Sequence, residues 1–246
     1  PMLLSVALGV GIDLALAAVL LPLLKLPRKQ RGVFLAMCTF SNTLFIGLPV
    51  CQQLFGDVCV PHVMVYYLAN TTLLQMVGVT MIAHFGQGEG HKVTAAGFLK
   101  SFFGKPPIVA VIVAILMVLL DIPLPATADR FMGYLANSVS PMALIYCGYV
   151  VYEIGLKNLR LMRGLPTMLA IRLVAAPAIC LVLCHVFGIQ GLARSVFTVE
   201  AGLPVVSQTP VMAGAYGADD RYAAIGATLS TVGCVITIPV LMVALG

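Results

Sequence analysis

Eight apolar stretches, joined by short polar loops, limit what this chain can fold into. To within a few residues, they cover 2–24, 32–54, 61–83, 106–124, 131–152, 165–187, 195–216 and 222–245. An α-helix needs about 20 apolar residues to cross the hydrocarbon core of a bilayer. Charged residues make up only 9% of the chain, against about 25% in a soluble domain. The sequence therefore predicts an all-α, polytopic membrane protein surrounded by the lipid bilayer.

The loop charges predict the orientation of these spans. Eleven Lys and Arg residues fall in the loops at 25–31, 84–105, 153–164 and 217–221, while Arg130 and Arg194 fall on the other side. Because cytoplasmic loops carry the excess of Lys and Arg, we expect these four loops to be cytoplasmic and both chain ends to face outward. The net charge of +5 is accounted for by these loops and calls for no nucleic-acid partner. We expect a multi-pass protein of the cell membrane, in a bacterium the inner membrane.

The second span carries an interruption. Ser41, Asn42 and Thr43 follow one another inside it, and Gly47 and Pro49 come next. Proline has no amide hydrogen, and its ring clashes with the carbonyl four residues earlier. A broken helix persists at membrane depth only where protein or a water-filled cavity covers its free backbone groups. We therefore expect the helix to break at 47–49 and the nearby polar side chains to face a polar site.

The seventh span carries a matching interruption. Pro204 and Pro210 enclose a polar cluster at 207–209, and Glu200 precedes it. One such span is typical of a proline-kinked helix whose hydroxyls pack against neighbouring helices. Two interrupted spans in corresponding positions of two halves indicate a transporter binding site instead. For the pair, we favour the binding site.

Short matches between the two halves predict an inverted repeat. Residues 31–34 (Arg-Gly-Val-Phe) match 194–197 (Arg-Ser-Val-Phe), and Asn-Thr-Thr at 70–72 matches Ser-Thr at 230–231. By the loop charges the two copies face opposite ways across the membrane, as inverted repeats do. We accordingly divide the chain into a first repeat of three helices at 1–85, a glycine-rich cytoplasmic linker loop at 86–105, and a second repeat of five helices at 106–246.

The residues of the second span also carry a family resemblance. Ser-Asn-Thr-Leu-Phe-Ile-Gly-Leu-Pro at 41–49, followed by Leu-Phe-Gly at 54–56, resembles the signature of the auxin efflux carrier family. Tyr-Leu-Ala-Asn-Thr-Thr at 67–72 and Asn-Ser-Val-Ser-Pro at 137–141 resemble its bacterial branch. The family includes plant auxin exporters and bacterial carriers of malate-like or malonate-like acids.

This resemblance implies a fold and an assembly. It implies ten helices in two inverted five-helix repeats, with two discontinuous helices that cross at mid-membrane. It also implies a transport domain that moves against a scaffold, and a homodimer formed through the scaffold helices. The chain begins at Pro1 and lacks counterparts of the family's first two helices. We therefore expect a fragment or a trimmed form of a longer protein.

Asn42 is the first candidate for substrate binding. An amide can donate to a carboxylate without the penalty of burying a charge, although it can also serve a helix–helix hydrogen bond. The resemblance implies that the substrate site lies at the crossover. The further candidates are Ser41, Thr43, Gly47, Pro49, Asn70, Thr71, Pro204, Ser207, Gln208, Thr209 and Pro210.

Three ionisable residues inside spans are candidates for ion coupling, since such residues are functional hypotheses by default. Glu200 would carry a proton, pair with a cation, or merely reach the membrane interface. Asp13 and Arg172 lie in spans that correspond in the two repeats. They would form an ion pair, join a buried network, or take part in substrate binding.

The composition and motifs favour transport over catalysis. The sequence has no phosphate-binding loop and no catalytic triad order or zinc-protease motif, so we expect no enzyme, no metal site and no cofactor beyond coupling to H⁺ or Na⁺. We predict a secondary active transporter of a small organic anion, such as a dicarboxylate or an auxin-like carboxylate, that works by alternating access. The alternatives are a sodium-coupled symporter of the bile-acid type and a non-transporting membrane sensor or binding protein.

Overall fold

The computed structural model of the chain describes residues 1–86 and 161–245, together with 122–135 and a few isolated positions between 109 and 152. Almost all of the predicted linker at 86–105, and most of the predicted spans 106–124 and 131–152, lie outside the described residues. The match at 137–141 lies there too, apart from Ser138. Within the described residues, every regular element is a helix.

The other six predicted spans are present as helices, four of them long and apolar enough to cross a membrane without a break. In chain order the elements are α1 (Met2–Leu24), α2 (Arg28–Thr39), a π-helical turn (Thr43–Gly47), α3 (Leu48–Phe55), a 3₁₀ turn (Asp57–Cys59), α4 (Val60–Leu73), a π-helical turn (Leu74–Gly78), α5 (Val79–Gly86), α9 (Leu165–Ala170), a π-helical turn (Ile171–Ala175), α10 (Ala176–Val186), α11 (Gly191–Ala201), α12 (Thr209–Ala215) and α13 (Asp220–Leu245).

The second predicted span is discontinuous, but the break lies earlier than the sequence predicts. Helix α2 ends at Thr39, the chain is extended at Phe40, and helical structure resumes at Thr43. The expected break at 47–49 is wrong, because the π-helical turn at 43–47 shifts the bonding to a five-residue step. Pro49 then follows directly after the π-helical turn, at the start of α3, and does not end the helical segment.

The seventh predicted span breaks where its prolines enclose it. Helix α11 ends at Ala201 and α12 begins at Thr209. Pro204 lies in the extended segment between them, and Pro210 lies in the first turn of α12. The short helices α2 and α11 thus both end inside the protein, and α3 and α12 both begin there.

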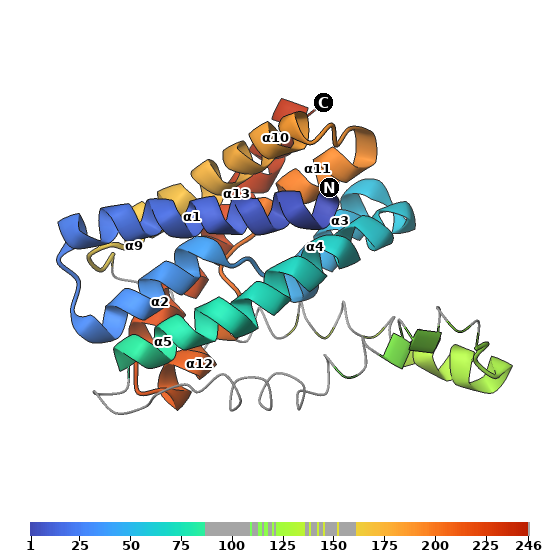
Figure 1. Cartoon of the computed structure of the whole chain (residues 1–246), viewed down its shortest axis with the longest axis horizontal. Helices are drawn as coiled ribbons and strands as arrows, with labels where there is room; N and C mark the ends of the chain where they lie inside the picture. The colour runs from blue at the N-terminus through green and yellow to red at the C-terminus, as the bar shows by residue number, and fades with distance from the viewer. Residues whose placement is uncertain are drawn as a thin grey trace.

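The unbroken helices pack against the two broken ones (Figure 1). Helix α1 packs against α2, α4 and α10, while α13 packs against α2, α11 and α12. Helices α2 and α5 approach closely, since Gly32 lies against the backbone of Met81 and leaves no room for a side chain. This close packing holds the first broken helix directly against the span that follows it.

The two larger of the three groups of buried side chains in the described part of the chain lie near the break after α2. One includes Phe40, Tyr66 and Phe197, and the rings of Tyr66 and Phe197 meet edge to face with centroids 5.6 Å apart. The other includes Phe34, Met37 and Tyr222. Both groups join residues of the first half of the chain to residues of the second, so the two halves share their core.

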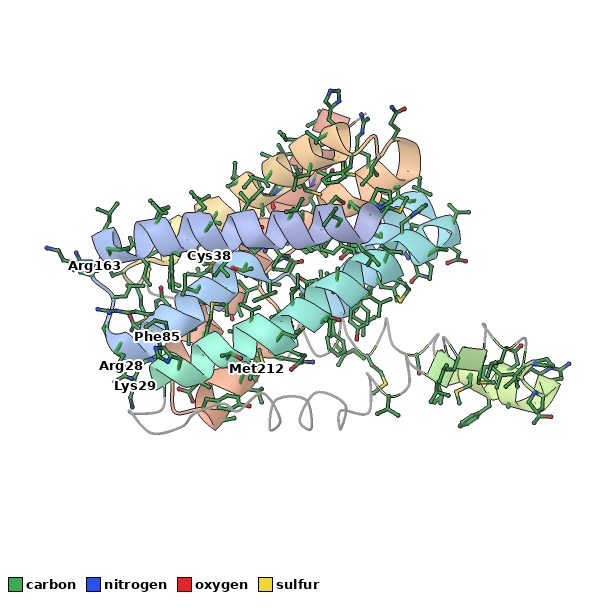
Figure 2. The ribbon with its side chains drawn as sticks, viewed as in Figure 1. Arg28, Lys29, Cys38, Phe85, Arg163 and Met212 are labelled. Atoms are coloured by element: carbon green, nitrogen blue, oxygen red, sulfur yellow. The ribbon has the colours of Figure 1, made fainter. Side chains whose placement is uncertain are left out.

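The described residues of the loops predicted to be cytoplasmic lie together at one end of the described helices. Figure 2 shows Arg28, Lys29 and Arg163 at this end. The amide of Asp219 donates to the carbonyl of Lys29, Arg28 donates to the carbonyl of His84, and the Tyr222 hydroxyl donates to the carbonyl of Arg163. The described parts of these loops therefore share one face, as the charge pattern predicts. The side of the membrane that this face occupies stays a prediction.

Candidate functional site at the crossing of two broken helices

The two extended segments meet and pair with each other. Ser41 and Val205 form an antiparallel bridge, and the amide of Asn42 donates to the carbonyl of Pro204 at 2.9 Å. The side chain of Asn42 crosses in the same direction, since its Nδ2 donates to the hydroxyl of Ser207 at 2.5 Å. Cys38, one turn before this contact, lies about midway along the helices in Figure 2. Ser41, Asn42 and Val205 are all buried, so the backbone groups of the crossing need partners within the protein.

Each extended segment is also held by one side chain from an unbroken helix. Asn70 on α4 bonds both backbone groups of Ser41, with Nδ2 donating to the carbonyl at 3.0 Å and Oδ1 accepting from the amide at 3.5 Å. Ser230 on α13 accepts from the amide of Val205 at 3.0 Å. Asn70 and Ser230 thus play the same part in the two halves of the chain.

Arg172 satisfies the ends of both short helices. It lies in the π-helical turn between α9 and α10 and is 1% exposed. Its Nη1 donates to the carbonyl of Thr39 at 2.8 Å and to that of Cys38 at 3.3 Å, and its Nη2 donates to the carbonyl of Ala201. These carbonyls belong to the last turns of α2 and α11, which have no partners within their own helices. One side chain therefore ties both helix ends together.

Glu200 is fully buried at the end of α11. Its Oε1 accepts from the thiol of Cys51 at 3.5 Å, and its Oε2 has no hydrogen-bond partner among the described residues. The interpretation that Glu200 reaches the membrane interface is therefore wrong. A β-carbon added to Gly47 would lie 2.5 and 2.7 Å from the two carboxylate oxygens. Gly47 thus permits this carboxyl group to lie directly on the π-helical turn.

Asp13 on α1 belongs to the surroundings of Arg172. The Asp13 side chain is 5% exposed, and its Oδ1 has no hydrogen-bond partner within the described part of the chain. The charge of Arg172 acts on Asp13 electrostatically, but the hydrogen bonds of the guanidinium go to the three carbonyls instead. Of the interpretations offered by the sequence, the buried network fits this arrangement.

The remaining predicted residues fall into two groups. Thr43 lies buried at the start of the π-helical turn, beside the crossing. The other polar candidates are occupied locally or turned outward: the Thr209 hydroxyl bonds the carbonyl of Val206, Thr71 bonds Tyr67 on its own helix, and Gln208 is exposed. The structure therefore brings together Ser41, Asn42, Asn70, Pro204 and Ser207, and does not bring Thr71 or Thr209 into their network.

Sequence reasoning missed two residues of this region. Ser230 was recognised only as the repeat counterpart of the polar group at 70–72, and that correspondence was the signal for its contact with the crossing. Cys51 follows Gly47 by four residues, so both lie on one helix face. That spacing was the available signal that Cys51 and Gly47 would contact the same group, which is the Glu200 carboxyl.

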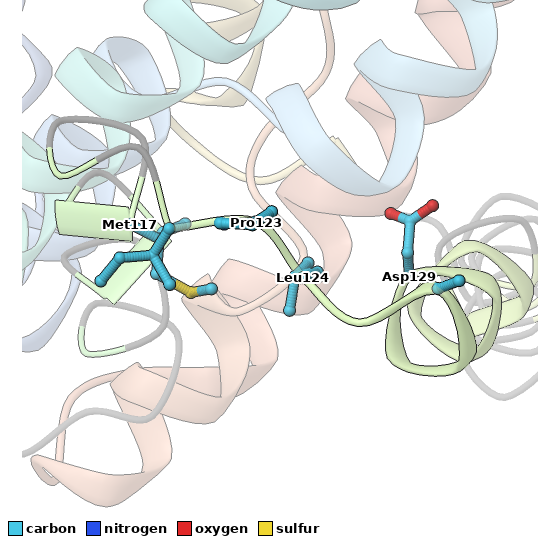
Figure 3. Close-up of a pocket in the computed structure, with 7 residues that line it drawn as sticks. Met117, Pro123, Leu124 and Asp129 are labelled. Carbon is cyan, nitrogen blue, oxygen red and sulfur yellow. The ribbon is translucent and has the colours of Figure 1, made fainter.

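A separate hollow of about 820 Å³ lies along the segment at 114–129 (Figure 3). It is lined by Ala114, Met117, Ile122, Pro123, Leu124, Ala126 and Asp129. None of the predicted site residues lines this hollow, so the crossing remains the candidate functional site.

Comparisons with known proteins relate the chain to membrane transport proteins. Residues 1–242 match the family described as membrane transport protein. An uncharacterized transporter of Methanocaldococcus jannaschii is 24% identical over 210 residues, which cover 84% of this chain and 66% of the relative. Another, of Methanothermobacter thermautotrophicus, is 24% identical over 189 residues, which cover 75% of this chain and 58% of the relative.

The chain thus spans about three fifths to two thirds of the length of these relatives. The family match, by contrast, extends over nearly all of the chain and includes both broken helices. The resemblance seen in the second span is therefore confirmed: the chain belongs to the auxin efflux carrier family of membrane transport proteins.

Proposed function

We propose that the protein is a secondary active transporter of a small organic anion, such as a dicarboxylate or an auxin-like carboxylate. It works by alternating access around the crossing of α2–α3 with α11–α12, as a multi-pass protein of the cell membrane. The membership of a transporter family supports the general class, and the chemistry of the crossing supports the anion.

The observation that carries this proposal is the set of donors on one side of the crossing. The half-helix that begins at Thr43 starts directly after Asn42, and α12 starts two residues after Ser207. Helix N-termini carry free amide groups and a partial positive charge that favour a carboxylate. The Ser41 hydroxyl is buried and has no partner among the described residues. Together with the Asn42 amide it offers a ligand polar contacts without a fixed positive charge.

The symmetry of the contacts supports an inverted-repeat carrier. In each half a broken helix is held by one polar side chain of an unbroken helix, Asn70 or Ser230. Inverted repeats with broken helices place their substrate near the bilayer midplane. The movement of one domain against a scaffold, and a homodimer formed through that scaffold, are parts of the same proposal.

Glu200 is the proposed carrier of a coupling proton. A buried carboxylate without a partner is costly in its ionised form, and Oε2 of Glu200 has no partner among the described residues. The carboxyl contacts the same π-helical turn that follows Asn42. Protonation of Glu200 is therefore expected to change the affinity of the anion site.

A counterflow screen tests the proposal. The purified protein is reconstituted in proteoliposomes, loaded with an unlabelled dicarboxylate or arylacetate from a panel, and assayed for uptake of the labelled acid. Saturable uptake of at least one acid is the expected result. Binding without flux would favour a membrane sensor instead, and uptake that requires sodium would favour a symporter of the bile-acid type.

A further inference from the structure

The two short helices end against one guanidinium group. A helix C-terminus carries a partial charge of about −0.5, so the ends of α2 and α11 together present about one negative charge. Arg172 supplies one positive charge at this place and donates to carbonyls of both helices. One guanidinium therefore meets the partial negative charge of both helix ends.

The guanidinium is also fixed in place. Both of its Nη atoms are occupied by carbonyls on different helices, and the side chain is among the largest that are fully buried. The planar fork of Arg suits two acceptors that lie apart, whereas the ammonium of Lys is a compact point charge. Both Nη atoms are consequently engaged by the protein itself, while Nε of Arg172 has no hydrogen-bond partner among the described residues. The carbonyls that the Nη atoms contact are those that a metal cation would take.

Backbone carbonyls of unwound segments and C-terminal ends of half-helices are the ligands that bind sodium in several broken-helix transporters. We propose that Arg172 occupies such a site permanently, as a tethered cation between α2 and α11, and that the crossing therefore closes and transports without sodium. The tethered cation is a property of the folded protein alone. Transport without sodium rests on the proposed function and concerns its coupling ion. Sodium is excluded at this place, which leaves the proton site at Glu200.

The relation to Asp13 separates this proposal from a simple ion pair. If Arg172 were held chiefly by Asp13, the carboxylate would take its hydrogen bonds, but Oδ1 of Asp13 has no partner among the described residues. The three carbonyls hold the guanidinium instead. Asp13 interacts with Arg172 only electrostatically, without a hydrogen bond.

Thermal unfolding of the purified protein in detergent tests the tethered cation. The variants are Arg172→Met, which keeps the length but removes the charge, and Arg172→Lys; Arg194→Met, at an exposed position of α11, is the matched control. The parent and Arg194→Met should unfold at the same temperature in sodium chloride and in choline chloride. Arg172→Met should unfold roughly 10 °C lower in choline chloride, and sodium or millimolar guanidinium should recover part of the loss.

The recovery is the decisive readout, because a role in packing alone would not respond to the identity of the cation. An Arg172→Met protein that unfolds alike in sodium, guanidinium and choline overturns the proposal. So does a parent protein that sodium stabilises over choline. If Arg172→Met is not obtained folded, Arg172→Lys decides: it should unfold below the parent and Arg194→Lys should not, and an unchanged midpoint for Arg172→Lys overturns the proposal.

Transport by the parent protein tests whether the crossing works without sodium. Uptake of the acid found by counterflow should proceed at the same rate when choline replaces all sodium. A requirement for sodium overturns the proposal of sodium-independent transport. If no acid is transported at all, the proposed function fails. The unfolding result still decides whether Arg172 is a tethered cation, so the two failures are distinguishable.

Discussion

Asn42 and Ser207, which lie 165 positions apart in the sequence, are joined across the crossing by a hydrogen bond from Nδ2 to Oγ of 2.5 Å. The bond connects the polar segments that precede the two inner half-helices, one from each half of the chain. A ligand that binds between these segments would replace this bond or share it. The pair is therefore the most direct place to test the anion site.

Asn42→Ala should weaken binding of the transported acid by roughly ten- to a hundredfold. A hydrogen bond to a charged group contributes about 1.5–3 kcal/mol, and each ~1.4 kcal/mol is a factor of ten. Asn42→Asp should weaken binding further, because it places a like charge against the carboxylate. Gln52→Ala is the control, since this amide bonds Asp57 in an exposed loop at the other end of the span. A folded Asn42→Asp protein with the parent's affinity would remove Asn42 from the site.

Gly47→Ala should disturb the crossing through Glu200. The added methyl would lie 2.5 Å from both Oε1 of Glu200 and Cδ1 of Leu203, so the buried carboxyl or the π-helical turn must move. We expect a lower unfolding temperature and slower transport. Truncating the Glu200 side chain should relieve much of the effect. The loss of unfolding temperature in Glu200→Ala/Gly47→Ala should therefore be smaller than the sum of the losses in the two single variants. Additive losses would show that the two residues do not meet.

Glu200→Gln should abolish the pH dependence of net uptake while leaving exchange of bound substrate intact. Glutamine has the shape of a protonated glutamate but cannot release a proton. The measurement is uptake and exchange over a range of external pH, with Asp57→Asn as the control for a carboxylate in an exposed loop. A transport-competent Glu200→Gln protein that keeps the parent's pH profile would exclude Glu200 as the proton carrier.

Single-cysteine labelling should place Lys29 and Asp219 on the same, cytoplasmic side of the membrane and Asp57 on the other. The first two are joined by a backbone hydrogen bond, and Asp57 is the first residue of the unbroken span that ends at Gly86. An impermeant maleimide applied to right-side-out vesicles should therefore modify only the cysteine at 57. Modification of positions 29 and 57 from one side would contradict the predicted topology.

The sequence predicted the helices and their ends well because those are local properties. Spans of about 20 apolar residues and clustered basic loops identified every span in the described part of the chain. The break was misplaced because Gly47 and Pro49 are read locally as helix breakers, whereas a π-helical turn absorbs the proline.

The partners at the crossing were harder to predict because they depend on tertiary packing. Asn42, Ser207 and Arg172 were all named, but nothing local tells that Arg172 donates to carbonyls of helices 133 and 29 positions away. A buried Arg in a span suggests an acidic partner, and Asp13 was the natural candidate. The carbonyl ends of two broken helices only become the stronger partner once α2 and α11 are brought together.

Asn70→Ala should destabilise the protein about twice as much as Ser230→Ala. Asn70 satisfies both backbone groups of Ser41, whereas Ser230 satisfies one amide, that of Val205. A buried polar group left without a partner costs about 1–3 kcal/mol, so the first variant loses two such terms and the second loses one. Thr231→Ala is the control, because its hydroxyl only bonds a carbonyl on its own helix. Unfolding temperatures in detergent measure the difference, and an Asn70→Ala protein as stable as Thr231→Ala would show that α4 does not hold the crossing.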